Sequence, residues 1–181
     1  MKKVILKILS IILGVVLLDQ ITKGFLLYLI TGNIPLCGPA WEIVSFPYLM
    51  TQVCDFFNIV FTWNPGTSFS MLRAVGEAAP LIIIIATGFI IGFIGYYLFT
   101  RAPSYERWPL ALIVGGALGN LIDRIRFGAV IDFLDFHVGG WHWPAFNVAD
   151  VCIVVGVGLF ILNWYLARRR CLESVKEKGG K

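Results

Sequence analysis

The sequence predicts an all-α membrane protein: a four-transmembrane-helix bundle with a small extracytoplasmic β or irregular subdomain and an interfacial helix. Of the 181 residues, 58% are hydrophobic and 14% are charged, whereas an average soluble domain has about 25% charged residues. Four apolar segments approach the roughly 20 residues that cross a bilayer, at about 4–30, 80–99, 108–123 and 148–167. This composition excludes intrinsic disorder, a fibrous repeat and an ordinary cytosolic enzyme, and it indicates a single membrane domain over residues 1–181.

The first two apolar segments predict membrane-spanning helices, and the first is interrupted by the polar residues Asp19, Gln20 and Lys23. The first follows a basic start, as a secretory signal would, but Asp19 and Gln20 occur where a small-residue cleavage site would be expected, so we expect an uncleaved span. The second contains no charged residue. It therefore meets the length and composition of a transmembrane helix directly.

The last two apolar segments carry one acidic residue each. The third is short unless it continues to Asp123 or beyond, and Gly115 and Gly119 have the four-residue spacing that lets helix backbones approach closely. That spacing is also common by chance in apolar sequence. The fourth contains only Asp150 as a charged residue, and the polar tail after it, from Arg168, is expected to be frayed.

The distribution of basic residues predicts the orientation. With four spans, both termini and the loop 100–107 share one side, which holds 11 of the basic residues, while the other side holds three. The positive-inside rule places the 11 in the cytoplasm, so the terminal clusters indicate orientation and not a nucleic-acid surface. The loops at about 31–79 and 124–147 then face outward, and the first is too long for a simple connector. We expect strands or an interfacial helix there.

Four ionisable residues fall within the predicted spans, where each costs a few kcal/mol and usually has a function. They are Asp19, Lys23, Asp123 and Asp150. The alternating direction of the spans places all four at a similar depth, toward the outer face. Asp19 and Lys23 are four residues apart, so they share a helix face and are expected to form a supporting ion pair.

An N-x-x-D pattern occurs twice, as Asn120 with Asp123 and as Asn147 with Asp150. Residues three apart share a helix face, so each amide can hold the carboxyl of its aspartate. The two patterns lie at the end of the third span and the start of the fourth, where two carboxyls can meet. Such a pair shares one proton, so that one carboxyl activates water and the other polarises a carbonyl. This is aspartyl protease chemistry, and it needs no metal and no cofactor.

Alternative roles remain open for these aspartates. Asp123 could instead pair with Arg124 or Arg126 at the end of a span. Asp150 could be an ordinary acidic residue in the first turn of a helix, where the macrodipole favours it. Asp132 and Asp135, in the outer loop, are expected to be solvated or turn-forming.

Other chemistry-bearing side chains predict no second site. His137 and His142 lie on a Gly-Gly loop and have a spacing that makes a poor metal site. Ser68 or Ser70 could form a dyad with Lys23, but nothing in the spacing favours it.

Five segments together resemble lipoprotein signal peptidase (signal peptidase II), a family of bacterial intramembrane aspartyl proteases. They occur in the family's order and extend from the first span to the fourth. The segments are Asp19-Gln20-Ile21-Thr22-Lys23, Asn64-Pro65-Gly66-Thr67-Ser68-Phe69-Ser70, Gly115-Gly116-Ala117-Leu118-Gly119-Asn120-Leu121-Ile122-Asp123-Arg124, Val130-Ile131-Asp132-Phe133 and Pro144-Ala145-Phe146-Asn147-Val148-Ala149-Asp150. One departure is that Thr67 and Ser68 stand where the family commonly has alanines.

The resemblance implies that Asp123 and Asp150 are the catalytic pair. It implies supporting or substrate-binding roles for seven further residues, namely Asp19, Lys23, Asn64, Gly66, Asn120, Arg124 and Asn147. The implied activity is removal of the signal peptide from diacylglyceryl-modified prolipoproteins, just before the lipidated cysteine. The implied setting is the bacterial cytoplasmic (inner) membrane, with lipid as a partner, both termini cytoplasmic and a monomeric enzyme.

Two other function classes compete with this interpretation. Intramembrane Asp and Lys are also typical of a small proton- or ion-coupled membrane transporter, although four spans without an evident inverted repeat are few for one. A non-catalytic assembly factor is the third class. Cleavage of a lipid-modified precursor by the purified protein separates the three.

Overall fold

The computed structural model describes residues 2–43, 51–66 and 78–179. Four long helices and one short helix account for most of them, and a small sheet accounts for much of the rest. The helices are α1 (Lys2–Thr31), α2 (Ala40–Ile43), α3 (Ala79–Thr100), α4 (Ser104–Phe127) and α5 (Val148–Gly179). The strands are β1 (Thr51–Cys54), β2 (Phe57–Asn64), β3 (Val130–Val138) and β4 (Trp141–His142).

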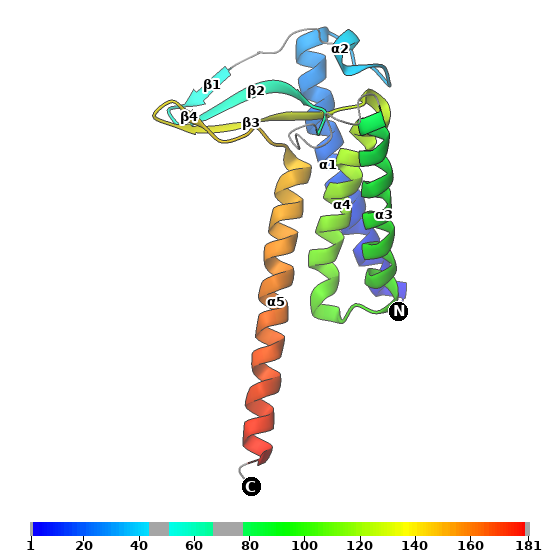
Figure 1. The fold of residues 1–181 in the computed structure, drawn as a ribbon, viewed down its shortest axis with the longest axis vertical. Helices are drawn as coiled ribbons and strands as arrows, with labels where there is room; N and C mark the ends of the chain where they lie inside the picture. The colour runs from blue at the N-terminus through cyan, green and yellow to red at the C-terminus, as the bar shows by residue number, and fades with distance from the viewer. Residues whose placement is uncertain (1, 44–50, 67–77, 180–181) are drawn as a thin grey trace.

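The long helices run side by side, and the sheet lies across one end of them (Figure 1). Both chain termini are at the opposite end (Figure 1). Helix α4 is central, because it contacts α1, α3 and α5. Three helices, α1, α3 and α5, are long and apolar enough to cross a membrane. The observed architecture is therefore mainly helical, with three candidate spans and a small sheet.

Two helices extend beyond the predicted apolar segments. The span predicted at about 108–123 lies within α4, which begins at Ser104 and continues to Phe127. Gly128 adopts a left-handed conformation with φ 75° that stops the helix. The tail after Arg168, expected to be frayed, is helical as far as Gly179. Its Arg, Leu, Glu and Lys residues are good helix formers, and the preceding span supplies a helix that they extend.

Small residues let α4 approach its neighbours closely, as the glycine spacing predicted. A Cβ on Gly115 would lie 2.8 Å from the Cβ of Val15, and one on Gly119 would lie 2.6 Å from an oxygen of Asp19, both on α1. Gly116 faces the other way, where a Cβ would collide with the carbonyl oxygen of Ala149 on α5. The glycines therefore bring the polar residues of three helices together.

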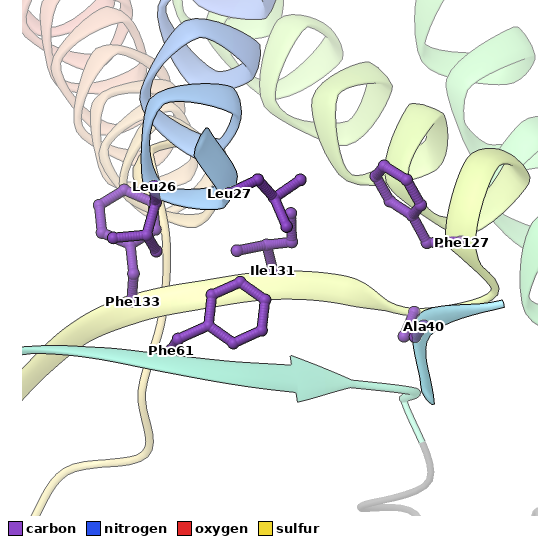
Figure 2. Packing of buried hydrophobic residues seen from close by; sticks show 8 residues of the cluster. Leu26, Leu27, Ala40, Phe61, Phe127, Ile131 and Phe133 are labelled. Atoms are coloured by element: carbon purple, nitrogen blue, oxygen red, sulfur yellow. The ribbon is translucent and has the colours of Figure 1, made fainter. Parts of the chain in front are cut away.

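The four strands form one antiparallel sheet in the order β1-β2-β3-β4. Strands in the first outer loop were expected and are present, and the helix in the described part of that loop is the four-residue α2. An apolar core fastens the sheet to the ends of α1 and α4 (Figure 2). Its buried members are Leu26, Leu27, Ala40, Phe61, Phe127, Ala129, Ile131 and Phe133.

Candidate active site

Lys23 is the centre of a buried ionic cluster. Its ammonium nitrogen lies 2.8 Å from Oδ2 of Asp19 and 2.8 Å from Oδ2 of Asp123, and Lys23 is only 1% exposed. It also donates to Oδ1 of Asn120 at 3.0 Å. The predicted ion pair of Asp19 and Lys23 is therefore confirmed, but the ammonium bridges two carboxylates, one from α1 and one from α4.

Asp123 is held on both carboxylate oxygens. Besides Lys23, it accepts hydrogen bonds from the Gln20 side-chain amide at 2.8 Å and from the Ile131 backbone at 3.3 Å, and it is fully buried. The alternative partner Arg126 instead donates to Gln20 and to the carbonyls of Pro35 and Leu36. The carboxylate of Asp123 is therefore fully occupied by partners from α1 and from the start of β3.

Asp150 lies in the first turn of α5, where Asn147 caps the helix. The backbone N–H of Asp150 donates to Oδ1 of Asn147 at 3.0 Å, and the backbone N–H of Asn147 donates to Oδ2 of Asp150 at 3.2 Å. These reciprocal bonds form a capping box. The side chain of Asn120 donates to the other oxygen of Asp150 at 2.7 Å. The expectation that each side-chain amide holds the carboxyl of its own motif was therefore wrong. The backbone N–H of Asn147 holds Asp150, the side-chain amide of Asn147 donates elsewhere, and Asn120 holds the aspartate of the other motif.

Asp132 was expected to be solvated or turn-forming, and this prediction was wrong. It lies in β3, is 2% exposed, and accepts hydrogen bonds from the side chains of Asn64 at 2.9 Å and Asn147 at 2.7 Å. Burial raises the pKa of Asp132 to about 6, the negative charge of Asp150 contributes to the rise, and the two amides oppose it. Asn147 therefore joins two carboxyl groups, those of Asp132 and Asp150.

Asp135 was also wrongly expected to be solvated, since it is 5% exposed. It accepts a hydrogen bond from Asn58 at 2.9 Å, and Nδ1 of His142 lies 2.9 Å from one oxygen and 3.0 Å from the other. Burial favours the neutral carboxyl, but these two contacts outweigh it and hold the pKa of Asp135 below its usual value. The sheet therefore contains two buried aspartates whose pKa values are shifted in opposite directions, upward for Asp132 and downward for Asp135.

Asn64, Gly66 and Arg124 complete the site from the sides of β2 and α4. Oδ1 of Asn64 accepts the backbone N–H of Gly66 at 2.8 Å, and Gly66 has a φ of 76° that a side chain would strain. This turn leaves the Asn64 amide free to donate to Asp132. The charge of Arg124 acts on Asp150, Asp132 and Asp123, and its buried Nε has no hydrogen-bond partner within the described ranges.

A hollow of about 500 Å³ opens beside Asp150. We call it the Asp150 groove, and it is lined by Trp143, Pro144, Ala145, Phe146, Asp150, Val151, Val154 and Val155. Among the residues that the structure describes, Asp150 is its only charged lining residue, and the remaining lining residues are apolar or aromatic. The groove can therefore hold an apolar chain against a carboxyl group. In the described part of the chain, no three His, Cys, Asp or Glu side chains are grouped so that they could hold a metal ion.

The structure brings together all the predicted site residues and adds two. Asp132 was quoted in a motif but given no role, since its position in an outward loop suggested solvation. Gln20 also contributes, because it contacts Asp19, Asp123 and Arg126 and thereby joins α1 to α4. A signal for Asp132 was present in the sequence, namely a run of apolar residues on both sides of it, which is typical of a buried strand.

Comparisons with known proteins identify the family. The family model described as "Signal peptidase (SPase) II" matches residues 11–166. A lipoprotein signal peptidase of Janthinobacterium sp. (strain Marseille) is 43% identical over 82% of this chain and 81% of its own length. One from Anaplasma phagocytophilum (strain HZ) is 38% identical over 83% of this chain and 87% of its own.

Solved structures agree with this result. Two described as bacterial membrane enzymes have a TM-score of 0.66, with 26% and 28% identity. The first comparison covers 88% of this chain and 87% of the other, and the second covers 86% and 90%. Sequence and fold thus lead to one conclusion: the chain belongs to the signal peptidase II family, the lipoprotein signal peptidases.

Proposed function

We propose that this protein is an aspartic endopeptidase of the bacterial inner membrane, and that Asp132 and Asp150 are its catalytic carboxyls. As a lipoprotein signal peptidase, it removes signal peptides from prolipoproteins. The family resemblance places the cut just before the cysteine that carries diacylglycerol. The transporter alternative has no support, because the matching family is one of proteases.

One observation carries the choice of residues: Asn147 donates to Asp132 and to Asp150, and the charge of Asp150 raises the pKa of Asp132. Carboxyls that share a proton need this kind of mutual influence. Asp123, the partner predicted from the sequence, is instead paired with Lys23 at 2.8 Å. A carboxylate neutralised by a buried ammonium is poorly suited to share a proton with Asp150, so we assign Asp123 a supporting role.

The environments of the two carboxyls suggest their roles. Asp132, with a pKa near 6, is the group that retains the shared proton, and it donates this proton to the carbonyl oxygen of the scissile peptide. Asp150 borders the groove and accepts a proton from the attacking water. Collapse of the tetrahedral intermediate then transfers a proton to the leaving amine. Arg124 stabilises the pair when it carries negative charge.

The topology proposed for the chain has four spans, with α4 as the fourth beside the three candidate spans. Both termini are cytoplasmic, and the segments 31–79 and 124–147 are extracytoplasmic. The site then lies at the outer membrane surface, where a signal peptide ends. Every residue of the site comes from one chain, so a monomer suffices.

Cleavage of a diacylglyceryl-modified prolipoprotein by the purified protein in detergent tests this proposal. The wild-type protein should cleave it, with EDTA causing no loss, and Asp150→Asn should abolish cleavage while leaving the unfolding temperature near that of the parent. Asp55→Asn is the matched control, because Asp55 lies exposed in the turn between β1 and β2. Full activity of Asp150→Asn, or activity lost with EDTA and restored by a divalent ion, would refute the mechanism.

A further inference from the structure

A second pair of ionisable residues lies in the sheet and is not used by the proposed chemistry. Asp135 of β3 is buried, and both of its oxygens are within 3.0 Å of Nδ1 of His142 on β4. The ring of His137 stacks on that of His142 at 5.0 Å. Among the described residues, Asp135, His137 and His142 are the ionisable side chains that act on one another here.

The position of His142 in the chain connects this pair to the groove. The residue after it, Trp143, is the first lining residue of the Asp150 groove. The Trp143 amide donates to the carbonyl of Phe136 at 2.8 Å, and Phe146 exchanges backbone hydrogen bonds with Leu134 at 2.8 and 3.1 Å. The segment 143–146 is therefore a wall of the groove, attached to β3 at both of its ends.

The strand β3 carries both aspartates of the sheet, and each is held by an asparagine of β2. Asn64 donates to Asp132, and Asn58 donates to Asp135. Asp135 is thus fixed relative to Asp132, and His142 is fixed relative to Asp135. Because β4 has only two residues, its backbone pairing alone is a weak attachment, and the side-chain contact supplies a specific one.

We propose that His142 is a positioning residue, which through Asp135 holds the 143–146 wall of the Asp150 groove in the conformation that binds the apolar part of the substrate. This inference rests on the proposed function, since it assumes that substrate occupies the groove. His142 itself touches no reacting group. Its loss should therefore weaken substrate binding and leave the catalytic pair intact.

Steady-state cleavage of the lipid-modified precursor by the full-length protein tests this inference. His142→Ala should raise KM about tenfold, which is the scale of one hydrogen bond to a charged group, with kcat close to the parent value. His142→Asn should restore KM to near the parent value, since its amide nitrogen can donate to Asp135. His142→Leu fills a similar volume without a donor and should resemble His142→Ala.

A double-mutant cycle provides the second measurement. In an Asp135→Ala background, His142→Ala should cause no further rise in KM, because the acceptor for the His142 hydrogen bond is already absent. Equal kcat losses with unchanged KM in the Ala, Asn and Leu variants would overturn the inference, and so would additive effects in the cycle. Failure here is distinct from failure of the catalytic assignment, because all these variants keep Asp132 and Asp150, whose roles are read separately from Asp150→Asn.

Discussion

Asp132 shows how burial tunes the pKa of a carboxyl group. Burial raises its pKa from 3.8 to about 6, so the folded state binds a proton there more tightly than the unfolded chain does. The stability contributed by this proton is fully present below about pH 4 and is lost as the pH rises through 6. The shift corresponds to roughly 3 kcal/mol, on the order of 1.4 kcal/mol per pKa unit.

The first prediction concerns this pH dependence. As the pH rises from 4 to 6.5, the unfolding temperature of the wild-type protein should fall more steeply than that of Asp132→Asn, because the amide of Asn has no proton to lose. Thermal unfolding in detergent at a series of pH values measures both slopes. Parallel slopes would show that Asp132 does not titrate in this range.

The second prediction concerns the cluster around Lys23. Lys23→Met leaves the buried carboxylates of Asp19 and Asp123 without their cation, so it should cost about 3–5 kcal/mol of stability. The triple variant Asp19→Asn, Lys23→Met, Asp123→Asn has no stranded charge and should recover much of this loss. Thermal unfolding of both variants is the measurement, and a triple variant less stable than Lys23→Met would contradict a coupled cluster.

Sequence reasoning succeeded at the residue scale where spacing alone determines contact. Asp19 and Lys23 are four apart on one helix, and their ion pair forms. The sequence could not show that the Asn120 side chain donates a hydrogen bond to Asp150, because this contact depends on how α4 and α5 pack. The catalytic assignment of Asp123 stays a prediction that the structure makes less favourable, since a lysine from a third helix reaches the same carboxylate.

At the scale of elements, the glycine surfaces of α4 position the site. Gly116 allows the first turn of α5, which carries Asp150, to contact α4 directly. A Cβ at this position would meet backbone atoms of Ala149, which cannot move without moving the helix. The distance between α4 and α5 therefore depends on the missing methyl groups of Gly116 and, farther along α5, of Gly156, where a Cβ would lie 2.8 Å from the carbonyl oxygen of Pro109.

The third prediction follows from this contact. Gly116→Ala should lower both the unfolding temperature and the cleavage rate, because α5 must shift away from α4. Gly88→Ala is the matched control, since nothing lies within 4 Å of a Cβ at that position of α3, and alanine favours the helix by about 1 kcal/mol. Thermal unfolding and cleavage assays compare the two. Equal stability of both variants would contradict the close packing described here.

Elements were predictable where their pattern was regular. The apolar runs indicated α1, α3 and α5, whereas the extent of α4 depended on its polar residues being buried against neighbours. The strand β3 was missed because Asp132 and Asp135 are three apart, which breaks the alternation that identifies a half-buried strand. In the described part of the first outer loop the helix is the four-residue α2, and the sheet covers the ends of α1 and α4.

At the scale of the whole molecule, the account requires the sheet and the termini to lie on opposite sides of the membrane. The structure places the sheet at one end of the helices and both termini at the other (Figure 1). Cys37 and Cys171 are exposed near these two ends. They therefore provide natural positions for labelling from either side.

The fourth prediction uses these two cysteines. In intact cells, a membrane-impermeant maleimide should label a variant that retains only Cys37 and should not label a variant that retains only Cys171. Permeabilised cells should label both, which controls for reactivity. The reverse pattern would place the termini outside and would contradict the proposed orientation.

The most direct measurement of the central claim compares cleavage of a diacylglyceryl-modified prolipoprotein by Asp132→Asn and by the triple variant Asp19→Asn, Lys23→Met, Asp123→Asn. Both are assayed as folded proteins in detergent, and the wild-type protein is the reference. If Asp132 and Asp150 do the chemistry, Asp132→Asn shows no cleavage above background while the triple variant, which lacks the Asp123 carboxyl, still cleaves. Cleavage at the wild-type rate by Asp132→Asn, with none by the folded triple variant, would contradict the account and would return the catalytic role to Asp123.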